Sequence, residues 1–178
     1  MKQHPAAAVE AARKIRLIVF DVDGVLTDGN ITLTSTGEEL KSFNVRDGHA
    51  IRMAFRGGLD IAVITGRESP MVQKRCDELG IKLVYQGIKH KHTSLKDIMV
   101  KTGYAVSEIA YMGDDVVDLP VMMSAGLGCC PSDAADEVIT RSDLVTAAAG
   151  GKGAARELVF FILRAKGLLE DLMARYIS

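Results

Sequence analysis

A short apolar segment that ends in carboxylates, near the start of the chain, constrains the fold most. Residues 15–20 are mostly apolar and β-branched, which is typical of a buried strand. Asp21 and Asp23 follow at once, and Gly24 bends the chain away from them. In an open α/β sheet, ligands bind at the carboxyl ends of the strands. Two carboxylates delivered to this edge predict a site that holds a cation.

A repeating order of strand and helix follows. Further strands are predicted at residues 60–65, 82–85, 109–112, 127–130 and 144–145, and helices at 49–56, 70–79, 91–101, 119–125, 133–139 and from 154 onward with a break near Gly167. This order favours an α/β fold with a doubly wound, mostly parallel, Rossmann-like sheet. Residues 31–43 predict a β-hairpin flap around Gly37. Asp47 is the predicted N-cap of the helix at 49–56.

Composition limits the class of protein. The 178 residues are 48% hydrophobic and 25% charged, which predicts a single globular domain over 1–178. Residues 1–14 would be a frayed helical lead-in and 147–178 a C-terminal tail and helix. A net charge of -1 gives no attraction to nucleic acid or an anionic membrane. Without a long apolar run or signal peptide, we expect a soluble, cytoplasmic protein that binds a small molecule.

Polar residues also follow the other predicted strands. They are Thr65, Gly66 and Arg67, then Lys91 at the start of a helix, and Gly113, Asp114 and Asp115. Since each group lies at a strand end of one sheet, carboxylates, a hydroxyl and cations should meet at one pocket. Phosphoryl transfer is the chemistry that such a set serves best. A hard cation such as Mg²⁺ would remove the repulsion between the carboxylates and a phosphate.

The order of these residues resembles the haloacid dehalogenase superfamily. Four motifs carry the resemblance: residues 21–28, Thr65 with Gly66, Lys91, and residues 113–118. The resemblance implies a phosphatase in which Asp21 forms an aspartyl-phosphate and Asp23 protonates the leaving alcohol and later activates water. It also implies that Thr65 and Lys91 hold phosphate oxygens. The implied Mg²⁺ ligands are the carboxylates of Asp21 and Asp114 and the main-chain carbonyl of Asp23, with Asp115 and Asp118 supporting them.

The first two motifs have only a hairpin and a helix between them, so there is no cap domain. Within the capless subclass, residues 42–48, 65–67, 85–87 and 150–157 resemble the family of 3-deoxy-D-manno-octulosonate 8-phosphate phosphatases of lipopolysaccharide precursor synthesis. The resemblance implies a phosphorylated sugar acid as substrate. It implies substrate contacts at Asp23, Asn44, Val45, Arg46, Asp47, Gly48, Arg52, Gly66, Arg67, Arg75 and Lys91. Several arginines suit an acidic sugar phosphate.

This family also implies a homotetramer in which neighbours cover the active sites. The segment at residues 149–156, with its glycines and the cations Lys152 and Arg156, is suited to that covering role. The alternative for this segment is a flexible linker before a C-terminal helix.

Two other functions are compatible with parts of the pattern. A phosphatase of nonulosonate 9-phosphates has a related substrate, but we expect it to differ at residues 45–47 and 65–67, where this chain has Arg46 and Arg67. A receiver-type signalling domain also phosphorylates an Asp at a strand end. Its paired acids come first in the chain, whereas here the pair Asp114 and Asp115 comes last, and Asp23 is available for hydrolysis. An enzyme is therefore favoured.

Overall fold

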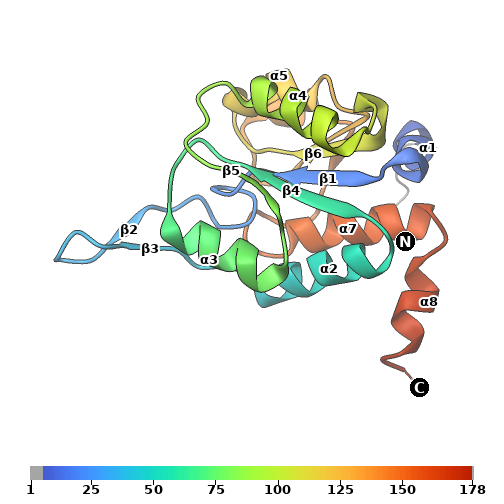
Figure 1. Ribbon diagram of the computed structural model, residues 1–178, viewed down its shortest axis with the longest axis horizontal. Helices are drawn as coiled ribbons and strands as arrows, with labels where there is room; N and C mark the ends of the chain where they lie inside the picture. The colour runs from blue at the N-terminus through green and yellow to red at the C-terminus, as the bar shows by residue number, and fades with distance from the viewer. Residues whose placement is uncertain (1–5, 178) are drawn as a thin grey trace.

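A six-stranded sheet forms the centre of the computed structural model, which describes residues 6–177 (Figure 1). The strand order is β5 (Leu83–Tyr85), β4 (Asp60–Ile64), β1 (Leu17–Phe20), β6 (Ile109–Met112), β7 (Leu127–Cys130) and β8 (Leu144–Val145). Each neighbouring pair in this sheet is parallel. The predicted doubly wound α/β sheet is confirmed.

The middle position of β1 follows from its sequence. All four of its side chains are buried, as expected for a strand covered on both faces. Phe20 pairs with Val63 on one side and with Met112 on the other, so three strands end at the same level. The chain moves from β1 to one side for β4 and β5, and to the other side for β6, β7 and β8. The end of β1 is therefore the topological switch point, where open α/β sheets bind ligands.

Helices cover both faces of the sheet and divide the core in two (Figure 1). One face carries α1 (Ala6–Lys14), α2 (Val45–Arg56), α3 (Pro70–Leu79), α7 (Ala154–Ala165) and α8 (Leu169–Ala174). The other carries α4 (Lys91–Thr102), α5 (Leu119–Met122) and α6 (Asp136–Ile139). Short 3-10 turns, η1 (Val106–Glu108) and η2 (Val116–Asp118), flank β6. No helix among the described residues is long and apolar enough to span a membrane.

The hairpin lies beyond the carboxyl edge of the sheet. Its strands β2 (Thr32–Leu33) and β3 (Glu39–Leu40) are antiparallel, and they extend away from the body at the left of Figure 1. Gly37 has a φ of 86° in the turn, as the sequence predicts. The hairpin is shorter than predicted, because only two residues of each segment pair.

Three local predictions need correction. The lead-in is an ordered helix in its described part, because Ala8 and Ala12 are buried against the core; residues 1–5 lie outside the described residues. Asp47 is not an N-cap, because α2 begins earlier: Asn44 caps it by accepting a hydrogen bond from the Arg46 amide at 2.8 Å. The predicted helices at 119–125 and 133–139 are only four residues long each.

The segment at residues 149–153 is neither a free tail nor a loose linker. The Gly150 amide donates to Asp133 at 2.9 Å, and the Gly151 amide donates to the Val25 carbonyl at 2.9 Å. A β-carbon at Gly150 would lie 1.8 Å from the Gly24 carbonyl oxygen. The following helix α7 buries seven residues in the core. The C-terminal part of the chain therefore supports the loop that carries Asp21 and Asp23.

Gly150→Ala should lower the free energy of unfolding by about 1–3 kcal/mol, because the new methyl group meets backbone that cannot rotate away. Denaturant unfolding measures this change. Gly58→Ala is the control: nothing lies within 4 Å of its added β-carbon, and only its positive φ of 75° is unfavourable, at about 1 kcal/mol. A smaller loss for Gly150→Ala than for Gly58→Ala would contradict the close contact.

Candidate active site

The site is built on the loop that leaves β1. Asp21 is 7% exposed, and its Oδ1 accepts a hydrogen bond from the Val22 amide at 2.7 Å. The Asp21 amide donates to the Met112 carbonyl, which fixes the loop to β6. Gly24 has a φ of 83° and turns the chain, so that the side chain of Asp23 stays at the same pocket. The sequence thus places both predicted catalytic carboxylates at the switch point.

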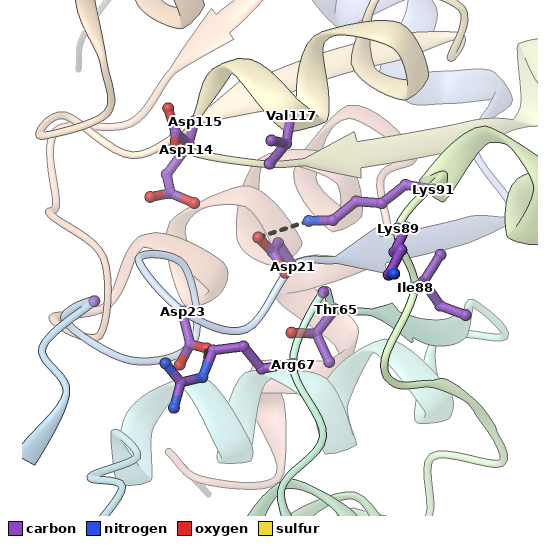
Figure 2. A pocket seen from close by; sticks show the side chains of 12 residues that line it. Asp21, Asp23, Thr65, Arg67, Ile88, Lys89, Lys91, Asp114, Asp115 and Val117 are labelled. Atoms are coloured by element: carbon purple, nitrogen blue, oxygen red, sulfur yellow. Dashed lines mark ion pairs between the residues drawn. The ribbon is translucent and has the colours of Figure 1, made fainter. Parts of the chain in front are cut away.

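Lys91 crosses to this loop from the first turn of α4. Figure 2 shows the ion pair of Lys91 with Asp21. Lys91 Nζ lies 2.8 Å from Asp21 Oδ2 and 2.6 Å from Asp118 Oδ1, and the Lys91 side chain is almost completely buried. Burial alone would lower the pKa of Lys91, but the two carboxylates raise it above its usual value. The Lys91 ammonium is therefore a fixed positive charge beside Asp21.

Asp118 is fully buried, and each of its oxygens already has partners. Oδ1 accepts from Lys91 and from the Tyr111 hydroxyl at 2.5 Å, and Oδ2 accepts from the amides of Asp114 and Asp115 at 3.1 and 3.3 Å. Burial and the nearby carboxylates raise the pKa of Tyr111, which keeps its hydroxyl a donor. Asp118 thus orients the ammonium and the loop that follows β6.

The residues present fit a divalent cation. Asp21, Asp114 and Asp118 each bring an oxygen within 4.8 Å of one another. None of the described residues forms a hydrogen bond or ion pair with the carboxylate of Asp114, and Gly24 leaves space for it, since a β-carbon there would lie 1.9 Å from Asp114 Oδ2. Each oxygen of Asp118 already accepts from two donors, whereas each oxygen of Asp21 has one partner, so Asp21 and Asp114 are the carboxylates with acceptor capacity left for a metal such as Mg²⁺. Asp115 instead caps η2 through the Val116 amide at 2.7 Å.

The pKa values reflect unbalanced negative charge. Burial, and then Asp118, raise the pKa of Asp21 to about 6, although Lys91 opposes the shift. Burial, and then Asp21 and Asp118, raise the pKa of Asp114 to about 7. One ammonium is not enough for three carboxylates, so a bound cation would relieve the cluster.

Asp21, Lys91 and Asp114 line a cavity of about 510 Å³. Figure 2 shows the side chains around this cavity. Thr65 and Gly66 line it from the loop after β4, and the Thr65 amide donates to the Tyr85 carbonyl at 2.9 Å. Its other lining residues are Asp21, Asp23, Gly29, Arg67, Ile88, Lys89, Lys91, Asp114, Asp115 and Val117. The four predicted motifs therefore meet at one cavity.

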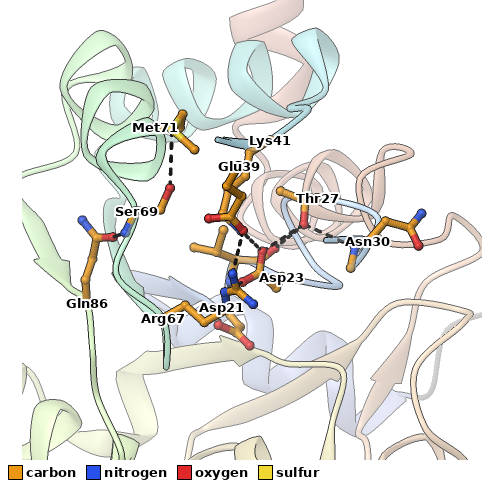
Figure 3. Close-up of polar contacts among 12 residues, drawn as sticks. Asp21, Asp23, Thr27, Asn30, Glu39, Lys41, Arg67, Ser69, Met71 and Gln86 are labelled. Atoms are coloured by element: carbon orange, nitrogen blue, oxygen red, sulfur yellow. Dashed lines mark hydrogen bonds and ion pairs between the residues drawn. The ribbon is translucent and has the colours of Figure 1, made fainter. Parts of the chain in front are cut away.

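The hairpin supplies two charged residues that the sequence reasoning missed (Figure 3). Lys41, whose side chain is 2% exposed, forms an ion pair with Asp23 and lies 3.4 Å from Glu39. Glu39 in turn binds Arg67 at 2.8 Å, and Arg67 Nε lies 3.8 Å from Asp23. Glu39 and Lys41 are two apart on an extended segment, so their shared face could have been predicted. The contact of Lys41 with Asp23 could not, because it joins two distant loops.

The remaining predicted substrate residues lie outside this cavity. Asn44 and Asp47 bind the C-terminal segment: the Asn44 amide group donates to the Gly151 carbonyl at 3.2 Å, and Asp47 accepts from the Arg156 amide at 2.7 Å. Val45 is 79% exposed. Gly48 makes room for Arg75, since a β-carbon there would lie 2.3 Å from the guanidinium.

Arg52 on α2 and Arg75 on α3 have other partners within the chain. Arg52 donates to the Glu78 carbonyl at 2.6 Å, and Arg75 forms an ion pair with Glu78 at 3.3 Å. Arg46 lines a separate cavity of about 360 Å³ together with Lys152, Arg156 and Arg164. All the predicted substrate arginines lie in the described part of the chain, and Arg67 is the one that lines the cavity at Asp21.

The sequence is similar to those of known phosphatases. Residues 84–158 match the model of the haloacid dehalogenase-like hydrolase family. The chain is 45% identical over 166 residues to 3-deoxy-D-manno-octulosonate 8-phosphate phosphatase of Escherichia coli (strain K12), covering 93% of this chain and 88% of the relative.

Solved structures are similarly close. A Moraxella catarrhalis 3-deoxy-D-manno-octulosonate 8-phosphate phosphatase, in complex with a magnesium ion, a phosphate ion and a KDO molecule, has a TM-score of 0.95 and 38% identity, covering 97% of this chain and 99% of that one. The cobalt-bound deoxy-D-mannose-octulosonate 8-phosphate phosphatase of Haemophilus influenzae has a TM-score of 0.89 and 39% identity, covering 94% and 99%.

Mg²⁺ should stabilise the protein more at pH 8 than at pH 5. The raised pKa values of Asp21 and Asp114 mean that the native state binds more protons than the unfolded state between about pH 4 and pH 7. The contribution of Asp21 and Asp114 to the free energy of unfolding therefore falls as the pH rises through that window. A bound cation replaces the lost protons and restores this contribution. Thermal unfolding with chelator or with Mg²⁺, at both pH values, measures the effect.

Asp114→Asn is the matched control for this experiment, because the amide keeps the shape and removes one charge. It should raise the melting temperature without metal at pH 8 and reduce the shift that Mg²⁺ produces. An equal Mg²⁺ shift in the variant and the parent protein would contradict Asp114 as a ligand.

Proposed function

This chain belongs to the haloacid dehalogenase superfamily, within the family of 3-deoxy-D-manno-octulosonate 8-phosphate phosphatases, and from this premise we propose which substrate it hydrolyses and how. It is a phosphoric monoester hydrolase. The proposed reaction is the Mg²⁺-dependent hydrolysis of 3-deoxy-D-manno-octulosonate 8-phosphate to the free sugar acid and phosphate, a step of lipopolysaccharide precursor synthesis.

One observation carries the proposal: the Asp21 carboxylate lies at the floor of an anionic cavity, held by Lys91 at 2.8 Å, with Asp23 two residues along the same loop. The Asp21 carboxylate is held in place, and the Asp23 carboxylate borders the space where a leaving group would lie. This arrangement suits a nucleophile and a separate acid–base group.

In the first step, an oxygen of Asp21 attacks the phosphorus atom and the bond from phosphorus to the sugar oxygen breaks. Asp23 donates its proton to that sugar oxygen, so the alcohol leaves neutral. Lys91 and Thr65 hold the non-bridging phosphate oxygens while charge moves across them. The product of this step is an aspartyl-phosphate on Asp21.

In the second step, Asp23 takes a proton from a water molecule, whose oxygen attacks the phosphorus. The bond between phosphorus and Asp21 breaks, and phosphate leaves with both carboxyl groups restored. Mg²⁺, held by Asp21, Asp114 and the Asp23 carbonyl, would supply the positive charge that lets a phosphate approach these carboxylates.

A single chain offers fewer contacts to the sugar acid than to the phosphate group. Arg67 borders the cavity and suits a carboxylate. Arg46, Arg52 and Arg75 lie elsewhere, and the hairpin exposes Ile31, Leu33 and Leu40 by 57%, 62% and 55%. Apolar side chains exposed together favour burial against another surface. We propose a homotetramer in which neighbouring chains contact these hairpins and cover each catalytic cavity.

A panel of three substrates tests the proposed activity: the octulosonate 8-phosphate, a nonulosonate 9-phosphate and a neutral sugar phosphate. We expect kcat/KM to be highest for the octulosonate 8-phosphate, because the Arg67 guanidinium can bind the carboxylate of this sugar acid. Asp21→Asn should abolish turnover and leave the melting temperature within a few degrees of the parent, since the amide does not attack phosphorus. First place for a neutral sugar phosphate, or turnover by Asp21→Asn, would refute the assignment.

The assembly is tested by Ile31→Ser combined with Leu33→Ser. This pair should lower the mass measured by light scattering and raise KM, because the hairpin would no longer hold a neighbour over the cavity. Val100→Ser is the matched control: it removes an even more exposed apolar side chain, 83% exposed on α4, and should change neither quantity. A parent protein that is monomeric and fully active would disprove the tetramer.

A further inference from the structure

Lys89 is a cation of the catalytic cavity that neither the four motifs nor the implied substrate contacts include. It lies in the loop between β5 and α4, two residues before Lys91, and lines the same cavity (Figure 2). Thr65 and Lys91, the groups proposed to hold the phosphate oxygens, line that cavity too.

The loop that carries Lys89 is fixed to the cavity wall. The Ile88 amide donates to the Thr65 carbonyl at 3.1 Å, and the Gly87 amide donates to the Arg67 carbonyl at 3.3 Å. Gly87 has a φ of 67°, and a β-carbon there would lie 2.9 Å from Glu68 Oε1, so the loop is closely packed at its turn. The main chain of Lys89 therefore keeps its place beside the phosphate-holding groups, and only the exposed end of its side chain is free.

The three cations of the cavity differ in their partners. Lys91 lies between Asp21 and Asp118, and Arg67 lies between Glu39 and Asp23. No carboxylate among the described residues is within ion-pair distance of Lys89. Among the described residues that line this cavity, Lys89 is therefore the cation that has no carboxylate partner before an anion enters.

A phosphate monoester that enters must approach four carboxylates, those of Asp21, Asp23, Asp114 and Asp115. An uncompensated ammonium at the edge of the cavity offsets part of that repulsion and attracts the dianion. We propose that Lys89 binds the phosphate group of the substrate during capture, as a binding residue that takes no part in bond making. This inference rests on the proposed phosphatase function.

A residue with this role affects binding more than chemistry. The phosphate group is anionic in both the bound substrate and the transition state, so an outer cation stabilises both to a similar extent. Its loss should therefore raise KM and leave kcat nearly unchanged. A merely structural role would not produce this split.

The test compares the parent enzyme with Lys89→Gln and Lys89→Arg, assayed with the octulosonate 8-phosphate. Lys89→Gln should raise KM about tenfold, as expected for one charge-assisted hydrogen bond, and keep kcat within about twofold. It should weaken competitive inhibition by inorganic phosphate by the same factor. Lys89→Arg should restore both constants. Added salt should raise KM more for the parent than for Lys89→Gln.

Lys74→Gln is the matched control, because Lys74 is also exposed, has no ion pair among the described residues and lies on α3 outside the cavity. It should leave KM and the phosphate inhibition constant unchanged. An unchanged KM for Lys89→Gln would overturn the proposal, and so would a fall in kcat alone. A raised KM with unchanged phosphate inhibition would place Lys89 at the carboxylate of the sugar acid and would also overturn it.

Titration of the protein with inorganic phosphate and Mg²⁺ in a calorimeter separates this inference from the proposed function. If the parent hydrolyses none of the phosphorylated sugar acids, the proposed function fails. Weaker phosphate binding by Lys89→Gln than by Lys74→Gln would still support Lys89 as a phosphate-binding residue, and equal binding would refute it.

Discussion

Repulsion among the carboxylates at the end of β1 is the constraint on which the site depends. Asp21, Asp114 and Asp118 bring oxygens within 4.8 Å of one another, and Lys91 is the cation that lies between two of them. Buried like charges raise the free energy of the native state unless they are paired or protonated. Asp118 is stabilised by four donors, Asp21 shares Lys91, and the carboxylate of Asp114 has no partner among the described residues. This unequal sharing makes the cluster a place for a divalent cation rather than a closed ion-pair network.

The fold can hold such a cluster because the loops that carry it are braced from several directions. The end of β1 is bonded to β6, and the loop after β4 is bonded to β5. Gly150 and Gly151 pack directly on the loop at residues 24–28, at distances that no side chain would allow. A carboxylate position that must be accurate to a fraction of an ångström for catalysis is thus fixed by segments far apart in the sequence.

Sequence reasoning succeeds where one residue type and its local position determine the outcome. The strand at 109–112 and the acids after it follow from a short apolar run that stops at Gly113, and the structure places them so. Sequence reasoning fails where the partner of a side chain comes from a distant segment of the chain. Asp47 has the character of an N-cap, but Asn44 takes that position and Asp47 binds the Arg156 amide 109 residues away. Lys41 has the pattern of an exposed hairpin residue, yet the Asp23 and Glu39 carboxylates bury it. Such contacts leave no periodic signal in the sequence.

The described residues form no cap domain, and this would explain why phosphate and sugar are recognised by different parts of the proposed assembly. Lys91, Thr65 and Lys89, the groups proposed to bind the phosphate, all line the cavity at the sheet edge, and they follow strands of the sheet. The proposed sugar acid would extend away from that edge, where the described residues of one chain offer the hairpin and Arg67. Arg67 is held there by its ion pair with Glu39 of the hairpin. The position of the hairpin therefore determines the position of the Arg67 side chain. In the proposed assembly, any contact that moves the hairpin would also move Arg67 and Lys41, and through Lys41 it would move Asp23, the proposed acid–base group. Assembly and chemistry would then be coupled through one short β-hairpin.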